Sequence, residues 1–266
     1  MFGFQGCRLF QFTVEDVTFD YNMRRGNMDG IHLNGPCRHG RVSNLKGATN
    51  DDMVALNADD GAMAEPDRGP IEDIQVDGLW AENGYTAVRL LSAGSPVRRV
   101  RISNVFDTFR FNVVSFTNHK VHPGTASTFD DVVIDGVFCS KAAAVPPMNV
   151  ASWLAQIWID APAVVSSLIL RNYHRTETAV PVDDIHVEAG ACVEHLLVDG
   201  AVLRNRSAGP IVFLHNRGRI RNLALRDVMA NAETNGGRIL ANTGAIDRLQ
   251  HGGVAGVGFE AGSETA

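Results

Sequence analysis

Residues 71–79 read IEDIQVDGL, and this phrase carries the pattern that decides the fold. Apolar and polar side chains alternate along it, which is typical of a β-strand with one buried face. The phrase ends in Asp-Gly, a pair that tolerates a tight bend of the backbone. It therefore predicts a strand followed by a corner.

The same phrase recurs from one end of the chain to the other. Its copies are VEDVTF from Val14, a weaker RVSNLKG from Arg41, VRRVRISNV from Val97, FDDVVIDGV from Phe129, VSSLILRNY from Val165, VEHLLVDGA from Val193, IRNLALRDV from Ile220 and a degraded IDRLQHGGV from Ile246. Successive copies start roughly 26–36 residues apart, within the window of about 20–50 residues that indicates a solenoid or similar array. Each copy predicts one structural unit.

A second apolar run follows in most units, about ten residues or more after the first. These runs are VALNA from Val54, VRLLS from Val88, FNVVSFTN from Phe111, IHVEA from Ile185, IVFLHN from Ile211 and RILANT from Arg238. Two or three strands per unit without a helical period predict an all-β parallel solenoid. We expect a short helix or an excursion over residues 140–163, and protruding loops over residues 59–70 and 118–128.

The length and composition fit one domain. The chain has 266 residues, 45% of them hydrophobic and 26 of them glycine, which excludes disorder and suits many short strands. We expect a β-helix domain over residues 1–257 and a polar tail over 258–266. The chain enters its first repeat without a capping segment, which predicts a truncated start or self-association through an uncapped first coil.

Charge and cysteine content exclude several classes of protein. A net charge of −6 without a long basic run argues against a nucleic-acid partner. No apolar segment is long enough to span a membrane, and the first residues carry no signal-peptide pattern. The four cysteines form no CxxC pair, so we expect no metal site, and buried thiols or a Cys7–Cys37 disulfide instead.

Three aspartates stand one repeat apart. Asp29 lies in NMDGI, 22 residues before Asp51 in NDDMVAL, where Asp52 follows directly. Stacked coils place neighbouring strands about 4.8 Å apart, so the three acids are expected to share one patch. Strand alternation would send Asp51 and Asp52 to opposite faces, so the pair must lie at a bend or bulge. Asn-Met-Asp-Gly is also what a plain turn would select.

These two motifs resemble those of glycoside hydrolase family 28, the polygalacturonase-like β-helix proteins. NMDGI is similar to the family's N-T-D-G-[IV] segment, and NDDMVAL is similar to its D-D-x-[IV]-A segment. The resemblance implies a right-handed, single-stranded, pectin-lyase-like β-helix, a polysaccharide substrate, no cofactor and an extracellular or periplasmic location. It also implies that Asp51 is the general acid, that Asp29 and Asp52 hold the attacking water, and that the anomeric configuration is inverted.

Two further family motifs are missing. Gly84-Tyr85-Thr86-Ala87 stands where the family has G-H-G, and Val114-Ser115-Phe116-Thr117 stands where it has R-I-K. The departures put a typical galacturonan substrate in doubt. Asn27, His32, Arg89, His119 and Lys120 are the candidates to bind substrate instead, and each could equally be a solvated surface residue.

Other interpretations stay open at this point. The fold could carry a non-catalytic glycan-binding or adhesive module, or a calcium-dependent lyase with Lys120 or Arg89 as its base. The acidic loop that contains Asp59, Asp60, Glu65 and Asp67 could hold calcium or be solvated. Several aromatic side chains could stack on sugars or lie between coils, namely Trp80, Tyr85, Trp153 and Trp158. Three histidines in strand phrases are expected on solvated faces or in hydrogen-bonded ladders, namely His186, His195 and His215.

Overall fold

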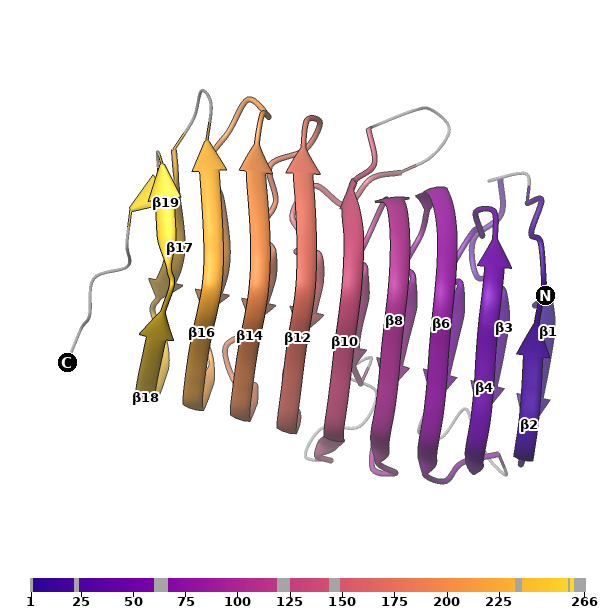
Figure 1. Cartoon of the computed structure of the whole chain (residues 1–266). Coiled ribbons are helices and arrows are strands. Elements are labelled where there is room, and N and C mark those ends of the chain that lie inside the picture. The colour runs from indigo at the N-terminus through magenta and orange to yellow at the C-terminus, as the bar shows by residue number, and fades with distance from the viewer. Residues whose placement is uncertain are drawn as a thin grey trace.

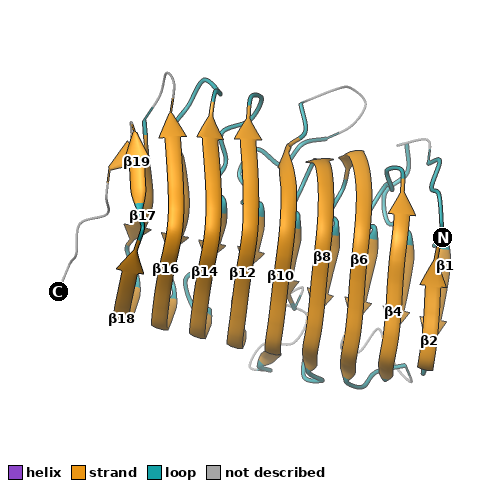
Figure 2. Cartoon of the chain, in the orientation of Figure 1, coloured by secondary structure: helices purple, strands orange, loops and turns teal. Residues whose placement is uncertain are grey.

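The computed structural model is a parallel β-solenoid of about eight stacked coils, as the repeats predict. It describes residues 2–21, 24–59, 67–118, 125–143, 149–232, 236–257 and 259–260. Figure 1 shows the coils stacked in chain order, with the two termini at opposite ends. Figure 2 shows that the described part of the chain consists of strands and loops. None of its residues forms a helix that could cross a bilayer.

Two parallel sheets run the length of the solenoid, and consecutive strands from β1 to β18 alternate between them. We name them by the length of their strands. The short-strand sheet contains β1 (Phe4–Cys7), β3 (Ile31–Asn34), β5 (Val54–Asn57), β7 (Val88–Leu91), β9 (Val114–Thr117), β11 (Ile157–Ile159), β13 (Ile185–Val187), β15 (Ile211–Asn216), β17 (Gly237–Asn242) and β20 (Phe259–Glu260). The long-strand sheet contains β2 (Phe10–Glu15), β4 (Cys37–Lys46), β6 (Ile71–Gly84), β8 (Val97–Phe109), β10 (Ser127–Lys141), β12 (Ala163–Glu177), β14 (Cys192–Asn205), β16 (Arg219–Ala232) and β18 (Ala245–Gly252), and β19 (Ala255–Val257) also pairs with β16.

The core consists of apolar columns that run perpendicular to the strands. Equivalent positions of successive coils stack in register, as in the column Val76, Ile102, Ile134, Leu170, Val198 and Leu225, all of them buried. Burying an aliphatic side chain of this size contributes about 1.5–3 kcal/mol. The alternating residues of the repeated phrase supply these columns, so its apolar period is the main source of the fold's stability.

A second column forms the corner that the phrase predicts. The residue at this position has a positive φ in each of eight successive coils, at Asn44, Gly78, Asn104, Gly136, Asn172, Gly200, Asp227 and Gly253. Glycine, asparagine and aspartate reach this left-handed region at low cost. The side chains also bridge coils, since Asn104 Nδ2 donates to Asp77 Oδ1 at 2.8 Å and Asn172 Nδ2 donates to Asp135 Oδ1 at 2.8 Å. The turn residues of the repeat therefore fix its corner.

Replacing Gly136 with alanine is expected to lower the free energy of unfolding by about 1–2 kcal/mol, the cost of a left-handed residue that carries a Cβ. Gly136 has a φ of 77°, and a Cβ there would lie 3.1 Å from Asn104 Oδ1. Gly252→Ala is the matched control, since a Cβ there meets nothing within 4 Å. Urea unfolding followed by circular dichroism measures both variants, and equal stabilities would contradict the role of the corner.

Several details differ from the sequence predictions. Of the two alternatives for residues 140–163, a helix is absent from the described part, which holds β11 and the ends of β10 and β12, and an excursion stays a prediction because residues 144–148 lie outside the described residues. The predicted loops over residues 59–70 and 118–128 fall largely outside the described residues, as does most of the predicted tail. All four cysteines are free thiols, so the alternative of a Cys7–Cys37 disulfide is wrong.

The strands of the first described coil end the two sheets of this chain. The strands β1 and β2 stand at the ends of the two sheets, and Phe4 and Phe10 on them are exposed. Unpaired strand edges favour association with another chain. Self-association through this end stays a prediction.

Candidate functional site

The structure brings the three predicted aspartates together on the short-strand sheet. Asp29 lies just before β3, and Asp51 and Asp52 lie just before β5, the next strand of that sheet. Backbone hydrogen bonds join the two approaches, from Gly30 N to Asp52 O at 2.9 Å and from Asp51 N to Met28 O at 3.2 Å. One carboxylate oxygen of each aspartate lies within 4.8 Å of the other two. We call these three residues the acid trio.

The bend before β5 keeps the adjacent pair on one side of the sheet. Asp51 and Asp52 precede the strand and escape its alternation, whereas Met53, the next residue, is buried in the core. Thr49 Oγ1 donates to Asp51 O at 2.5 Å, and Asp52 N donates to Asp51 Oδ1 at 3.1 Å. These local bonds hold the bend that the sequence requires.

Two members of the acid trio are more deeply covered than an open patch implies. Asp29 is 1% exposed and Asp52 is 2% exposed, while Asp51 is partly exposed. Asp51 is therefore the member of the acid trio that solvent reaches. The coverage comes from side chains of neighbouring coils, which sequence spacing does not reveal.

His32 contacts Asp29 directly. Its Nδ1 lies 2.6 Å from Asp29 Oδ2, and Asn57 Nδ2 donates to its Nε2 at 3.1 Å. Since the amide is the donor at Nε2, the imidazole proton lies on Nδ1 and points to Asp29. The ring also stacks on Phe2, with centroids 4.2 Å apart. His32 therefore positions Asp29 and is itself buried, which limits its predicted contact with substrate.

Arg89 contacts Asp52 from the next coil. Its Nε lies 2.8 Å from Asp52 Oδ2, and its side chain is 16% exposed. The strand register places Arg89 beside Ala55 and Ala55 beside His32, so a small residue separates the two basic groups. Arg89 thus neutralises an acid of the trio, whereas the sequence assigned it to the substrate.

Burial and mutual repulsion raise the pKa of the adjacent acids. Burial raises the pKa of Asp51, the charge of Asp29 raises it further, and Arg89 opposes both. Burial also raises the pKa of Asp52, to about 8, against the attraction of Arg89 and with the charges of Asp51 and Asp29 adding to it. Such a site favours binding a proton near neutral pH, and Asp51 is its exposed member.

Tyr85 and Thr86 lie just before β7 and next to the acid trio. The Thr86 side chain hydrogen-bonds Asp52, and the Tyr85 ring stacks on Phe111 with centroids 3.8 Å apart. Burial raises the pKa of Tyr85, and the charges of Asp51 and Asp52 raise it further. Tyr85 therefore keeps its hydroxyl proton and lies within the electrostatic field of the acids.

The remaining predicted residues contribute less. Asn27 is exposed, with a φ of 54°, and its backbone hydrogen-bonds the Asp51 carboxyl. His119 and Lys120 lie outside the described residues. Sequence reasoning missed Asn57, which pairs in register with Asn34, and Arg110, whose guanidinium lies 5.3 Å from the centre of the Tyr85 ring. The repeated VALN and IHLN strands are the signal that could have found Asn57.

The four aromatic candidates lie apart, with Trp80 and Trp158 on different sheets and Tyr85 and Trp153 between strands. Trp80 belongs to a stacked column with Phe106, Phe138 and His174 on the long-strand sheet, away from the acid trio. Trp153 is 71% exposed. Trp158 lies on the short-strand sheet and stacks on His186 with centroids 4.5 Å apart. Only Tyr85 and Trp158 share a sheet face with polar clusters.

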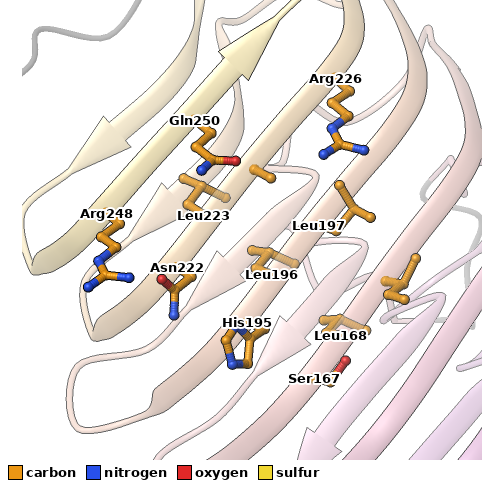
Figure 3. A pocket seen from close by; sticks show the side chains of 12 residues that line it. Ser167, Leu168, His195, Leu196, Leu197, Asn222, Leu223, Arg226, Arg248 and Gln250 are labelled. Atoms are coloured by element: carbon orange, nitrogen blue, oxygen red, sulfur yellow. The ribbon is translucent and has the colours of Figure 1, made fainter.

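A shallow hollow of about 310 Å³ also lies on the long-strand sheet, over β12, β14, β16 and β18 (Figure 3). The partly exposed Leu197 and Ala224 line it, with His195, Asn222 and Arg248 among its polar residues. The acid trio belongs to the other sheet, so this hollow is not part of the candidate site.

No protein-family model, curated protein or solved structure matches this chain. The resemblance to polygalacturonase-like proteins therefore depends on the two acidic motifs alone.

Proposed function

We propose that the protein binds a polysaccharide across the short-strand sheet and hydrolyses a glycosidic bond at the acid trio. The observation that supports this proposal is the convergence of three carboxylates within 4.8 Å, two of them with a raised pKa. Acid and base catalysis of hydrolysis requires carboxyl groups that hold protons differently at one pH.

The exposure of the acids suggests their roles. Asp51 is the accessible member, so it donates its proton to the glycosidic oxygen as the C–O bond breaks. Asp29 accepts a proton from the attacking water, because His32 orients its Oδ2 and its buried Oδ1 has no hydrogen-bond partner among the described residues. Asp52, paired with Arg89, contributes to the electrostatic environment of Asp51 and Asp29. Water reaches the covered acids more easily than a sugar does.

The spacing of the acids does not favour inversion. Inverting enzymes separate their two carboxyl groups by about 6.5–9.5 Å to admit water, and the nearest oxygens of the acid trio lie within 4.8 Å. The roles given to Asp51 and Asp29 describe direct displacement by water, which inverts the anomeric configuration, so the stereochemical outcome tests these roles. Proton magnetic resonance of the first product anomer measures it directly.

A second candidate is a non-catalytic glycan-binding module. The burial of Asp29 and Asp52 favours it, as does the ion pair between Asp52 and Arg89. The lyase has less support, since Arg89 faces an acid rather than open solvent and Lys120 lies outside the described residues.

A panel of pectins and other plant and microbial glycans tests the proposal. We expect the wild-type protein to release reducing ends from at least one of them. Affinity electrophoresis on the same panel detects binding without cleavage. Binding with no release from any bound glycan would overturn hydrolysis and support the binding module, and an unsaturated product that absorbs in the ultraviolet would indicate a lyase.

A further inference from the structure

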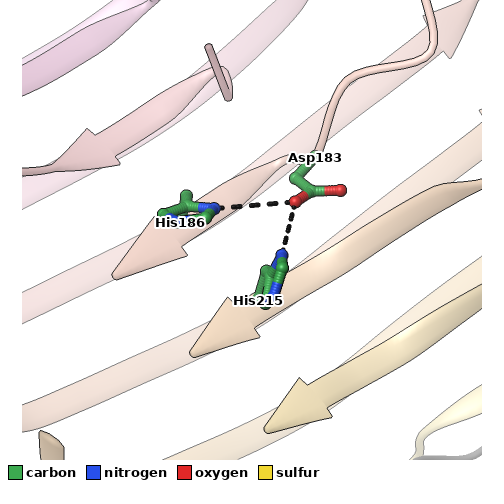
Figure 4. Close-up of side chains that lie close together, drawn as sticks. All are labelled: Asp183, His186 and His215. Atoms are coloured by element: carbon green, nitrogen blue, oxygen red, sulfur yellow. Dashed lines mark hydrogen bonds and ion pairs between the residues drawn. The ribbon is translucent and has the colours of Figure 1, made fainter. Parts of the chain in front are cut away.

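A second polar cluster lies several coils beyond the acid trio on the same sheet. Asp183 precedes β13, His186 lies on β13, and His215 lies on β15, in register with His186. Figure 4 shows the two imidazoles pointing to the same carboxylate oxygen. Nothing in the proposed hydrolysis uses these residues.

The distances in this cluster match those between the ligands of one metal ion. Asp183 Oδ2 lies 2.9 Å from His215 Nδ1 and 3.6 Å from His186 Nδ1. One ligand atom of each residue lies within 4.8 Å of the other two. Tetrahedral zinc with bonds of about 2.0–2.1 Å separates neighbouring ligand atoms by about 3.4 Å. Small side-chain rotations would therefore bring all three atoms onto one ion.

The neighbours of His186 orient its ring as metal-binding histidines are oriented. Its Nε2 lies 3.3 Å from Glu188 Oε2, and Arg217 Nη1 holds Glu188 Oε1 at 3.0 Å. A carboxylate beside Nε2 favours a proton on Nε2 and leaves Nδ1 free to bind a metal. Asp183 is anchored as well, since Val212 N donates to its Oδ1 at 3.3 Å.

Ordinary hydrogen bonds account for only part of the cluster, because His215 Nδ1 lies at hydrogen-bond distance from Asp183 Oδ2 and His186 Nδ1 does not. His186 is buried, and its Nδ1 lies 3.6 Å from Asp183 Oδ2, beyond the distance of a hydrogen bond. The Trp158 ring stacks on one side of the imidazole and the His215 ring packs on the other.

We infer that Asp183, His186 and His215 bind a divalent transition-metal ion through two Nδ1 atoms and one carboxylate oxygen, with zinc as the ion we commit to. Two imidazoles and a carboxylate suit zinc or ferrous iron, whereas calcium and magnesium prefer oxygen ligands. Three protein ligands leave a coordination position for water or a ligand. This inference does not depend on the proposed hydrolysis.

Isothermal titration of the full-length, EDTA-treated protein with zinc chloride tests the inference. We expect one zinc site per chain in the wild type. Zinc affinity should be at least about 100-fold weaker in Asp183→Asn and His215→Ala, because even the loss of a residue that only orients a ligand weakens metal binding about 10–100-fold. Glu188→Gln is expected to weaken binding about 10–100-fold. It retains all three proposed ligands, so it tests the cluster even where a ligand variant misfolds.

Two controls locate the bound ion. His195→Ala removes a histidine of the long-strand sheet, and the triple variant Asp29→Asn, Asp51→Asn, Asp52→Asn removes the other acidic cluster. Both are expected to bind zinc as the wild type does. No zinc binding by the wild type, unchanged affinity in the folded cluster variants, or loss of binding in the triple variant alone would overturn the inference.

Discussion

Asp51→Asn is expected to lower the rate of glycan hydrolysis about 10²–10⁴-fold, the usual contribution of a general acid. Asparagine has nearly the same shape but no proton to give to the leaving oxygen. The effect should fall mainly on kcat, because the substrate still meets the same surface. Asp51 is the member of the acid trio that solvent reaches, so this substitution tests the chemistry with little change in the packing.

The pH dependence provides an independent measurement of the same group. Burial and the charge of Asp29 raise the pKa of Asp51, so its acid form persists above the pH range of an ordinary aspartic acid. Activity should then fall as pH rises through that raised pKa, and Asp51→Asn should lose this dependence. Asp199→Asn, on the long-strand sheet, is the control and should leave rate and profile unchanged. A wild-type rate in Asp51→Asn would exclude it as the acid.

The fold could be predicted because the residues of each repeat determine its strand and its corner locally. The phrase at residues 129–137 supplies the alternating core positions Val132 and Ile134, the left-handed corner at Gly136, and a further core position after the corner at Val137. These are local properties of the backbone and of side-chain alternation. Stacking then follows, since a single coil cannot bury its own apolar face.

Of the candidate site, the sequence could predict only which backbone positions the stacking of coils brings together. A repeat spacing brings Asp29 beside Asp51, but it does not say which side chains of adjacent coils cover them. Arg89 reaches Asp52 from β7, and His32 bonds to both Asp29 and Asn57. These contacts depend on side-chain length and rotamer across coils, which a sequence pattern leaves undetermined.

One signal for the second cluster was present in the sequence. Asp29-Gly30-Ile31-His32 and Asp183-Asp184-Ile185-His186 share the pattern D-x-I-H before a short strand, and in both the first aspartate meets the histidine three residues later. The second copy also contains an acid pair. In this pair the two side chains point to opposite faces, as strand alternation requires. Asp183 is partly exposed, and Asp184 is completely buried.

A network of polar groups stabilises the buried carboxyl group of Asp184. Arg175 Nη1 lies 2.9 Å from Asp184 Oδ1, and Arg175 Nη2 lies 2.7 Å from Glu177 Oε2, with all three side chains fully buried. Tyr173 Oη also donates to Asp184 Oδ1, and Val182 O accepts from Arg175 Nη1 at 2.8 Å. One guanidinium therefore compensates two carboxylates inside the coil.

Arg175→Ala is expected to lower the free energy of unfolding by about 3–5 kcal/mol, because it leaves the carboxyl groups of Glu177 and Asp184 buried without their cation. Urea unfolding followed by circular dichroism measures the loss. Arg101→Ala is the control, since its ion pair with Asp135 at 3.0 Å is exposed and should contribute little. Adding Glu177→Gln and Asp184→Asn to Arg175→Met should recover much of the stability, because neither carboxylate is then left buried without Arg175. A loss in Arg175→Ala no larger than in the control would mean that the network is not what retains these acids in the core.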